Sequence, residues 1–155
     1  MSFKIESARQ TDIPQLTELL NDLFDVELDF TADSTRQVRG LELLLAEDGA
    51  TADRQIVAVA RDDHDQAIGM ASAQIVVSTA EGALSAWIED VVVHHDYRRQ
   101  GIGRNLLDYL VEWAKTRGAT RVQLVVDQEN DSADFFYQAL GWQTTQLVVR
   151  RRSTG

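Results

Sequence analysis

The chain has 155 residues, no cysteine and a net charge of −10 from 25 acids and 15 bases. That length suits one domain with a sizeable core, and the lack of cysteine excludes disulfides, thiolate metal sites and a cysteine-bound intermediate. The acidic charge argues against a nucleic acid partner, and no apolar stretch is long enough to span a membrane. The N-terminus also lacks a secretion signal, so we expect one cytoplasmic domain over residues 1–155.

Apolar patterning predicts four strands in the first two thirds of the chain, at residues 3–8, 56–60, 68–78 and 83–93. Two helices are predicted between the first and the second of these strands. Thr11–Pro14 has the hydroxyl and the early proline of a helix start. Ser34 and Gln37 indicate a capping box for the second helix. The continuous run Val91–Val93 is typical of a strand that is covered on both faces.

The last third of the chain predicts a helix, a strand, a helix and a strand. The first of these helices is amphipathic and ends at Gly118. The strand at 122–126 follows it. Asn130 or Asp131 caps the last helix, which precedes a final strand at 147–149. The whole order, β-α-α-β-β-β-α-β-α-β, predicts an α/β fold with a mixed sheet and helices on its faces.

An arginine- and glycine-rich loop joins the strand at 83–93 to the next helix, and it reads Arg98, Arg99, Gln100, Gly101, Ile102, Gly103 and Arg104. The first turn of a helix offers unpaired amides and a dipole that favours an anion, and glycine lets the backbone approach a ligand. The arginines make a phosphate-bearing ligand a better interpretation than an ordinary glycine-rich turn. A P-loop pattern is missing, and the dinucleotide fingerprint is broken at Leu106.

Two motifs of this sequence resemble the GNAT superfamily of acyl-CoA-dependent N-acyltransferases. The family loop, [RQ]-x-x-G-x-[GA] after a hydrophobic strand that ends in valine, matches Arg98–Gly103. A second family pattern, N-x-x-A-x-x-F-Y-x-x-x-G-[FW], is matched by Asn130, Ala133, Phe136, Tyr137, Gly141 and Trp142. The order of elements over residues 3–150 is similar as well.

The resemblance implies a mostly antiparallel sheet, flanked by helices, that splays between two central parallel strands at 83–93 and 122–127. Acetyl-CoA is then the co-substrate. Its pantetheine arm pairs with the main chain of Val91 and Val93, and its pyrophosphate lies on the amides of Arg99–Arg104. The implied cofactor-binding residues are Val91, Val92, Val93, Arg98, Arg99, Gln100, Gly101, Ile102, Gly103, Arg104, Asn130, Ala133, Phe136 and Tyr137.

Acyl transfer from a thioester needs a neutral amine, a stabilised oxyanion and a protonated leaving thiolate. Direct attack by the amine in a ternary complex is the simplest route, with a serine or threonine acyl intermediate left open. Tyr137 matches the family's general acid, and its alternative role is that of a core aromatic. We favour Asp90, directly or through water, over Glu89 as the base, while both are hydrogen-bonded or surface carboxylates in the alternative interpretation. Val91 is the expected oxyanion donor through its main-chain N–H.

Residues 22–48 hold eight acids and two bases, from which we predict a cationic amine acceptor, with a solvated acidic surface as the equal alternative. A polyamine, an aminoglycoside-like amine or a basic peptide end would fit. No metal site is expected, since His94 and His95 fit a solvated turn. The resemblance implies a homodimer, and many members continue past the strand at 143–151, so we expect a partner subunit to complete the acceptor wall. The rival functions are a non-catalytic acyl-CoA-binding module and a ligand-free interaction domain.

Overall fold

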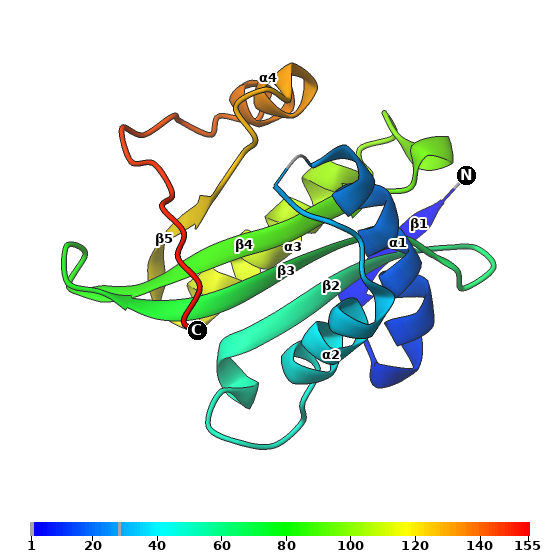
Figure 1. Ribbon diagram of the computed structural model, residues 1–155, viewed down its shortest axis with the longest axis horizontal. Helices are drawn as coiled ribbons and strands as arrows, with labels where there is room; N and C mark the ends of the chain where they lie inside the picture. The colour runs from blue at the N-terminus through cyan, green and yellow to red at the C-terminus, as the bar shows by residue number, and fades with distance from the viewer. Residues whose placement is uncertain (1, 28) are drawn as a thin grey trace. The chain divides into compact units, whose positions relative to one another are not determined.

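The computed structural model describes residues 2–27 and 29–155, which form two compact units, Met1–Leu124 and Val125–Gly155. The strands all lie in the first unit, and they are β1 (Phe3–Ser7), β2 (Gln55–Asp62), β3 (Ala67–Ser78), β4 (Ala83–Val93) and β5 (Ala119–Leu124). Three α-helices of the first unit are α1 (Ile13–Val26), α2 (Ser34–Leu44) and α3 (Ile102–Thr116) (Figure 1). The second unit contains α4 (Asp131–Ala139).

The five strands form one sheet in the order β1-β2-β3-β4-β5. The first four strands pair antiparallel, and β4 pairs parallel with β5. Short turns connect β2 to β3 and β3 to β4, whereas the parallel pair needs a long crossover, which α3 provides. The prediction of a mixed, mostly antiparallel α/β sheet with flanking helices is confirmed.

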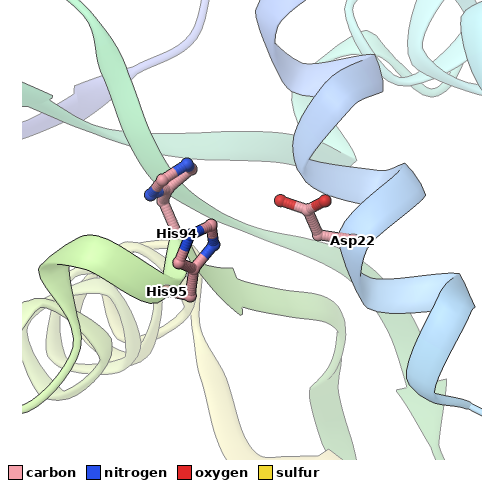
Figure 2. Close-up of side chains that lie close together, drawn as sticks. All are labelled: Asp22, His94 and His95. Carbon is pink, nitrogen blue, oxygen red and sulfur yellow. The ribbon is translucent and has the colours of Figure 1, made fainter.

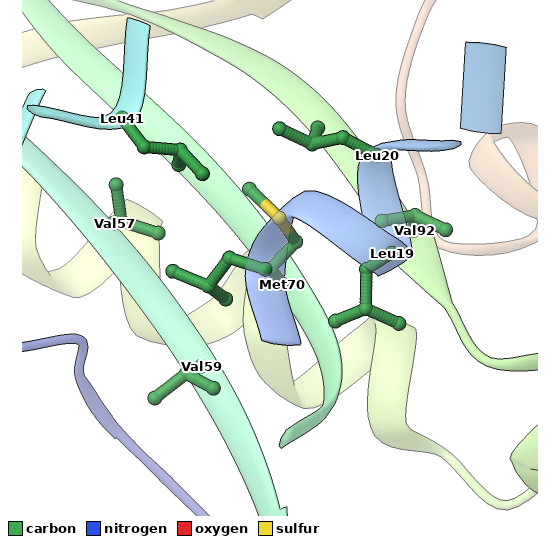
Figure 3. Packing of buried hydrophobic residues seen from close by; sticks show 8 residues of the cluster. Leu19, Leu20, Leu41, Val57, Val59, Met70 and Val92 are labelled. Atoms are coloured by element: carbon green, nitrogen blue, oxygen red, sulfur yellow. The ribbon is translucent and has the colours of Figure 1, made fainter. Parts of the chain in front are cut away.

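The sheet is covered on both faces within the first unit. Alternate residues of β2 point to opposite faces, so Val57 and Val59 contact α1 and α2 together with Met70 (Figure 3). On the other face, a Cβ added to Gly69 would lie 3.2 Å from Ile102 and 3.3 Å from Leu106, both on α3. Glycine at this position therefore lets the first turns of α3 pack closely against β3, which fixes where the loop before α3 ends.

The cap of α2 differs from the expected one. Asp33, not Ser34, is the N-cap, and its Oδ1 accepts a hydrogen bond from the Arg36 amide at 3.2 Å. The Asp33 amide in turn donates to Gln37 Oε1 at 2.8 Å. The reciprocal pair that the sequence suggested thus exists one residue earlier, because a carboxylate in the extended conformation accepts from the first turn more strongly than the following hydroxyl.

The strands of the last third also differ from the prediction. The structure begins β5 at Ala119, directly after the left-handed turn at Gly118 (φ 88°), and ends it at Leu124. The predicted strand at 147–149 is wrong, because residues 143–155 form no strand and are exposed. The parallel pair consequently lies at the edge of the sheet rather than at its centre. Across the described residues, no helix combines the length and the apolar character needed to cross a membrane.

Candidate functional site

A β-bulge in β4 sets the position of the two candidate bases. Met70 pairs with Val92 and Ser72 pairs with Glu89, so Asp90 and Val91 together oppose the single residue between Met70 and Ser72. The backbone of Asp90 adopts φ 56°, in the left-handed region that aspartate tolerates better than most residues. Side chains of a regular strand alternate between its two faces, and the bulge interrupts this alternation. The sequence alone therefore left open which of the two carboxylates faces the site.

Asp90 lines a cavity of about 470 Å³ beside α1, α2 and the link between them. Glu89 is exposed and is not among the residues that line this cavity. The cavity also presents two aromatic rings, two more carboxylates and a cation, from Phe24, Phe30, Asp29, Asp33 and Arg36. The structure therefore places one of the two candidate bases, and not the other, in a recess that can hold a small molecule.

Burial away from water, together with the negative charges of Glu89 and Glu27, raises the pKa of Asp90 to about 6. A carboxylate with this pKa is ionised at neutral pH but holds a proton far better than an ordinary aspartate. Such a group can take a proton from an amine and release it to water, which is the property of a general base.

The parallel strands part just before the bulge. Their pairing runs from Leu84 with Ala119 to Ile88 with Leu124, so the last five residues of β4 have no partner on β5. This is the gap expected beside the pantetheine arm. The side chain of Val92 belongs to the core cluster, which limits its contribution there to main-chain groups. The Val93 carbonyl already accepts a hydrogen bond from Arg98 Nε at 3.2 Å.

The loop before α3 ends in an open helix N-terminus. Gly101 is the N-cap, with φ 82°, and no side chain within residues 29–155 caps the helix there. Arg99 also takes a positive φ, 63°. The side chain of Ile102 is buried against Gly69, so only its amide can face a ligand. These features fit an anion site.

The polar residues of this loop face the solvent. Arg98, Arg99, Gln100 and Arg104 are all exposed, and Arg104 Nε lies 3.8 Å from Asp108 in the next helical turn. Exposed guanidinium groups keep their reach and can turn toward a phosphate. Gly103 sits in the first turn of α3, where its amide has no acceptor inside the helix.

The second sequence motif lies in the second unit. The amide of Ala133 donates to Asn130 Oδ1 at 3.1 Å, so Asn130, rather than Asp131, caps α4. The Tyr137 ring packs edge-on against Phe136, with ring centroids 5.1 Å apart, and against Trp142 at 6.1 Å. Tyr137 is half-buried. The capping role of Asn130 is therefore present, and the aromatic residues of the motif form one small cluster.

A further group of polar side chains was missed by the sequence interpretation. Asp22 of α1 lies beside His94 and His95, and one ligand atom from each of the three is within 4.8 Å of the others. Figure 2 shows the Asp22 carboxylate turned toward the two imidazole rings. The adjacent histidines were visible in the sequence, but nothing in it places a residue of the first helix next to them.

Comparison with known proteins gives one family. Residues 13–142 match the model of the acetyltransferase (GNAT) family. An aminoglycoside N(6')-acetyltransferase of Acinetobacter genomosp. 13 is 33% identical over 94 residues, 59% of this chain and 64% of that one. The ribosomal protein bS18 alanine N-acetyltransferase of Escherichia coli K12 is 35% identical over 66 residues, 43% of each chain. The chain thus spans less than two thirds of the length of these relatives.

The fold is shared with solved acetyltransferases. An aminoglycoside N-acetyltransferase in complex with CoA superposes with a TM-score of 0.82 at 21% identity, over 99% of this chain and 96% of the other. The family model covers both sequence motifs, the bulged strand and the open helix N-terminus. The chain belongs to the acetyltransferase (GNAT) family.

Proposed function

We propose that this protein transfers an acetyl group from acetyl-CoA to a cationic primary amine, with residues 1–155 acting as one domain. The observation that carries the proposal is Asp90, a carboxylate with a pKa of about 6 on a bulged strand, which lines a cavity of about 470 Å³. Family membership supports the reaction class. The relatives that act on aminoglycosides and on a ribosomal protein support an amine acceptor.

The proposed cofactor site runs from the end of β4 to the start of α3. The unpaired edge of β4 after Ile88 would hydrogen-bond the pantetheine arm, as an added strand pairs with a sheet. The amides of Arg99–Arg104, at an uncapped helix N-terminus, would hold the pyrophosphate, with the exposed arginines adding charge. Asn130, Ala133, Phe136 and Tyr137 remain proposed cofactor contacts from the second motif.

In the proposed reaction, Asp90 accepts a proton from the ammonium group of the acceptor, directly or through water. The neutral amine nitrogen then attacks the thioester carbonyl carbon, forming the C–N bond. The main-chain N–H of Val91 is the proposed oxyanion donor, since Val91 is one of the two bulge residues outside the one-to-one pairing of β4 with β3. The C–S bond then breaks, its electron pair leaves on the CoA thiolate, and the thiolate takes a proton from Tyr137. The attacking nitrogen loses its remaining extra proton, which restores the phenol, directly or through water. Glu89 is the second candidate for the base, and its exposure makes it the weaker one.

Tyr137 is the proposed general acid. A phenol has an ordinary pKa of about 10, close to that of a thiol leaving group, so it can protonate the departing CoA thiolate. We expect the Tyr137→Phe variant to bind acetyl-CoA with unchanged affinity and to have a lower kcat. Trp142→Phe is the matched control, because it perturbs the same aromatic cluster and leaves the phenol in place. Equal turnover in Tyr137→Phe and in the unaltered protein would assign Tyr137 to packing alone.

The charge of the cavity supports a cationic acceptor. The described residues that line the cavity include three carboxylates, those of Asp29, Asp33 and Asp90, and one cation, Arg36. Arg36 Nε is already 3.6 Å from Asp33. Phe24 and Phe30, which also line the cavity, have ring centroids 5.4 Å apart, and the negative quadrupole of an aromatic ring attracts cations. A polyamine, an aminoglycoside-like amine or a basic peptide end all carry the matching charge.

The acceptor class is tested by CoA release from acetyl-CoA with a panel of amines matched in size. Cationic amines should be preferred over neutral and anionic ones. Asp29→Asn should raise KM for the cationic acceptor, whereas Asp48→Asn, an exposed acid outside the cavity, should leave it unchanged. A preference for neutral or anionic amines would overturn the substrate class while leaving the acetyl transfer itself intact.

We also propose a homodimer in solution. The family resemblance implies one, and Leu147, Val148 and Val149 expose 77%, 64% and 67% of their surfaces, which suits burial against a partner. Light scattering should give twice the chain mass of 17.4 kDa. A monomeric mass at a protein concentration of tens of micromolar would contradict the proposed dimer and would leave the proposed reaction unaffected.

A further inference from the structure

We propose that Asp22, His94 and His95 form a binding site for a late first-row divalent cation such as Zn²⁺. One ligand atom from each side chain lies within 4.8 Å of the others (Figure 2). Zn²⁺ bonds of about 2.0–2.2 Å bring the ligand atoms of a tetrahedral site to about 3.3 Å from one another. Asp22 and His95 are exposed, so rotation of their side chains can close this difference without moving the backbone.

The backbone explains why two neighbouring histidines face the same way. In a strand, adjacent side chains point to opposite faces. Here β4 ends at Val93, His94 takes φ −52° and ψ 136°, and a short 3-10 helix begins at His95. The chain turns at this point and stacks the two rings, with centroids 4.3 Å apart and planes inclined by 25°. Both rings therefore lie on the side where Asp22 of α1 approaches.

Asp96 places a carboxylate near both rings, where it can become the outer acceptor that orients metal-binding histidines once a cation is bound. Its Oδ1 lies 3.2 Å from His95 Nε2, and its Oδ2 lies 3.8 Å from His94 Nδ1. A carboxylate that accepts from one ring nitrogen fixes the proton there and leaves the other nitrogen as a ligand. This arrangement would leave Nδ1 of His95 and Nε2 of His94 to bind the cation.

Binding through His94 requires a local rearrangement. In the structure, His94 Nδ1 accepts a hydrogen bond from the Asp96 amide at 3.2 Å. A ring that ligates through Nε2 carries its proton on Nδ1, so this bond would be lost. The Nδ1–H would then donate to the nearby Asp96 carboxylate, which replaces a neutral acceptor with a charged one.

The donor set selects the class of ion. Two imidazole nitrogens with one carboxylate oxygen suit Zn²⁺, Co²⁺ or Ni²⁺, whereas Mg²⁺ and Ca²⁺ prefer all-oxygen sites. Three protein ligands leave a position for water. The net charge of −10 also favours a cation over an anion at this surface. A bound ion would cross-link α1 to the start of the segment that leads into the loop at 98–104.

The test uses the full chain and ZnCl2, with calorimetry for affinity and Co²⁺ as a visible-absorption probe. We expect saturable one-to-one binding and a rise in melting temperature with Zn²⁺. His95→Ala and Asp22→Asn should each weaken Zn²⁺ binding by at least about tenfold, and Asp96→Asn by about ten- to hundredfold. The Co²⁺ spectrum should lose intensity in the first two variants.

Two matched controls separate this site from general binding to an acidic surface. Asp25 is exposed on the same helix as Asp22, and His64 lies in the turn between β2 and β3. Asp25→Asn and His64→Ala should bind Zn²⁺ as the unaltered protein does. Binding that never saturates, or an equal loss in Asp22→Asn and Asp25→Asn, would overturn the proposal. None of these outcomes depends on acetyl transfer.

Discussion

The hydroxyl of Ser72 on β3 donates a hydrogen bond to the carbonyl oxygen of Glu89 on β4, at 3.2 Å. The next residue, Asp90, is the one whose backbone turns into the left-handed region to form the bulge. Ser72 is 1% exposed, so water cannot replace this bond. The contact therefore anchors the carbonyl beside the bulge and with it the direction of the candidate base.

Ser72→Ala should loosen the bulge. Removal of a buried hydrogen bond leaves the Glu89 carbonyl short of a partner, so we expect a loss of about 1 kcal/mol in the free energy of unfolding and a several-fold fall in kcat. Ser85 is the control, because its hydroxyl makes the same kind of bond to the Arg121 carbonyl, also at 3.2 Å. Ser85→Ala should lose similar stability in urea titrations and keep its kcat. Equal effects on kcat would mean that the bulge does not need this anchor.

Asp90→Asn should remove the proposed base with little strain, because asparagine also tolerates a positive φ. We expect kcat/KM to fall by about 10²–10⁴-fold, the usual contribution of a general base. In the unaltered protein, kcat/KM should rise as the pH passes through about 6, where Asp90 loses its proton. Glu89→Gln is the control: it should keep the rate at neutral pH and move this rise to lower pH, because it removes one of the charges that raise the pKa of Asp90. If kcat/KM of Asp90→Asn still rose as the pH passed through about 6, another residue would have to be the base.

The same substitution should stabilise the fold. The folded-state pKa of Asp90 is about 6, above the unfolded value of 3.8, so the folded state binds more protons between these pH values. Stability due to this group is therefore highest below pH 3.8 and falls as the pH rises through about 6. At pH 7.5, Asp90→Asn should raise the free energy of unfolding by about 1–3 kcal/mol. An unchanged or lower stability would contradict the raised pKa.

Gly101→Ala tests the open N-terminus of α3. An added Cβ meets only Asn105, at 3.7 Å, but the φ of 82° strains any residue with a side chain, so the loop should shift. We expect a cost of about 1–2 kcal/mol and an increase of about tenfold in KM for acetyl-CoA. Gly118→Ala provides the matched strain at φ 88° at the other end of α3. It should lose similar stability and keep its KM, and a raised KM in both variants would remove the specific role of Gly101.

A buried ion pair should make the fold sensitive to acid. Arg61 is 1% exposed and donates to the Asp12 carboxylate at 2.8 and 2.6 Å, with Glu6 as a further partner. Burial acts to raise the pKa of Asp12, but hydrogen bonds from Arg61 and the Arg9 amide outweigh it and leave the pKa lowered. The stability from this pair is therefore present above pH 3.8 and is lost as the pH falls below it.

Asp12→Asn should therefore cost about 3–5 kcal/mol at pH 7, because it leaves a buried guanidinium short of charge. The free energy of unfolding of this variant should also depend less on pH below 3.8 than that of the unaltered protein. Asp65 is the control, since it pairs with the same guanidinium at 3.7 Å but is exposed. Asp65→Asn should change the unfolding free energy by less than about 1 kcal/mol in acid and urea titrations. Similar losses in the two variants would contradict the burial argument.

Local patterns predicted most of the fold, because strands β1 to β4 and helices α1, α3 and α4 each carry their own periodicity and stop signals. The glycine at the start of α3 was predictable for the same reason, since the glycines and arginines of this loop are contiguous, and its role in binding the cofactor stays a prediction. The bulge at Asp90 was not, because it depends on how β3 pairs with β4. The failed strand at 147–149 shows the opposite limit: apolar residues favour a strand only when another strand is there to pair with them.

The other features that the sequence did not predict depend on how residues far apart in the chain come together. The sequence does not reveal that Asp22 approaches His94 and His95, or that Asp29 and Asp90 share a cavity, since the members of each set come from separate elements. The choice of Asp33 over Ser34 as a helix cap is a smaller case. Both residues are good caps, and only the backbone conformation distinguishes them.

The central claim is acetyl transfer from acetyl-CoA to a cationic amine with Asp90 as the base. The most direct measurement is CoA release from acetyl-CoA, with and without each cationic amine, in the unaltered protein and in Asp90→Asn. We predict amine-dependent release that rises through a pH of about 6 and falls by about 10²–10⁴-fold in the variant. Tight acetyl-CoA binding without release for any amine would contradict the claim and identify a non-catalytic acyl-CoA-binding module.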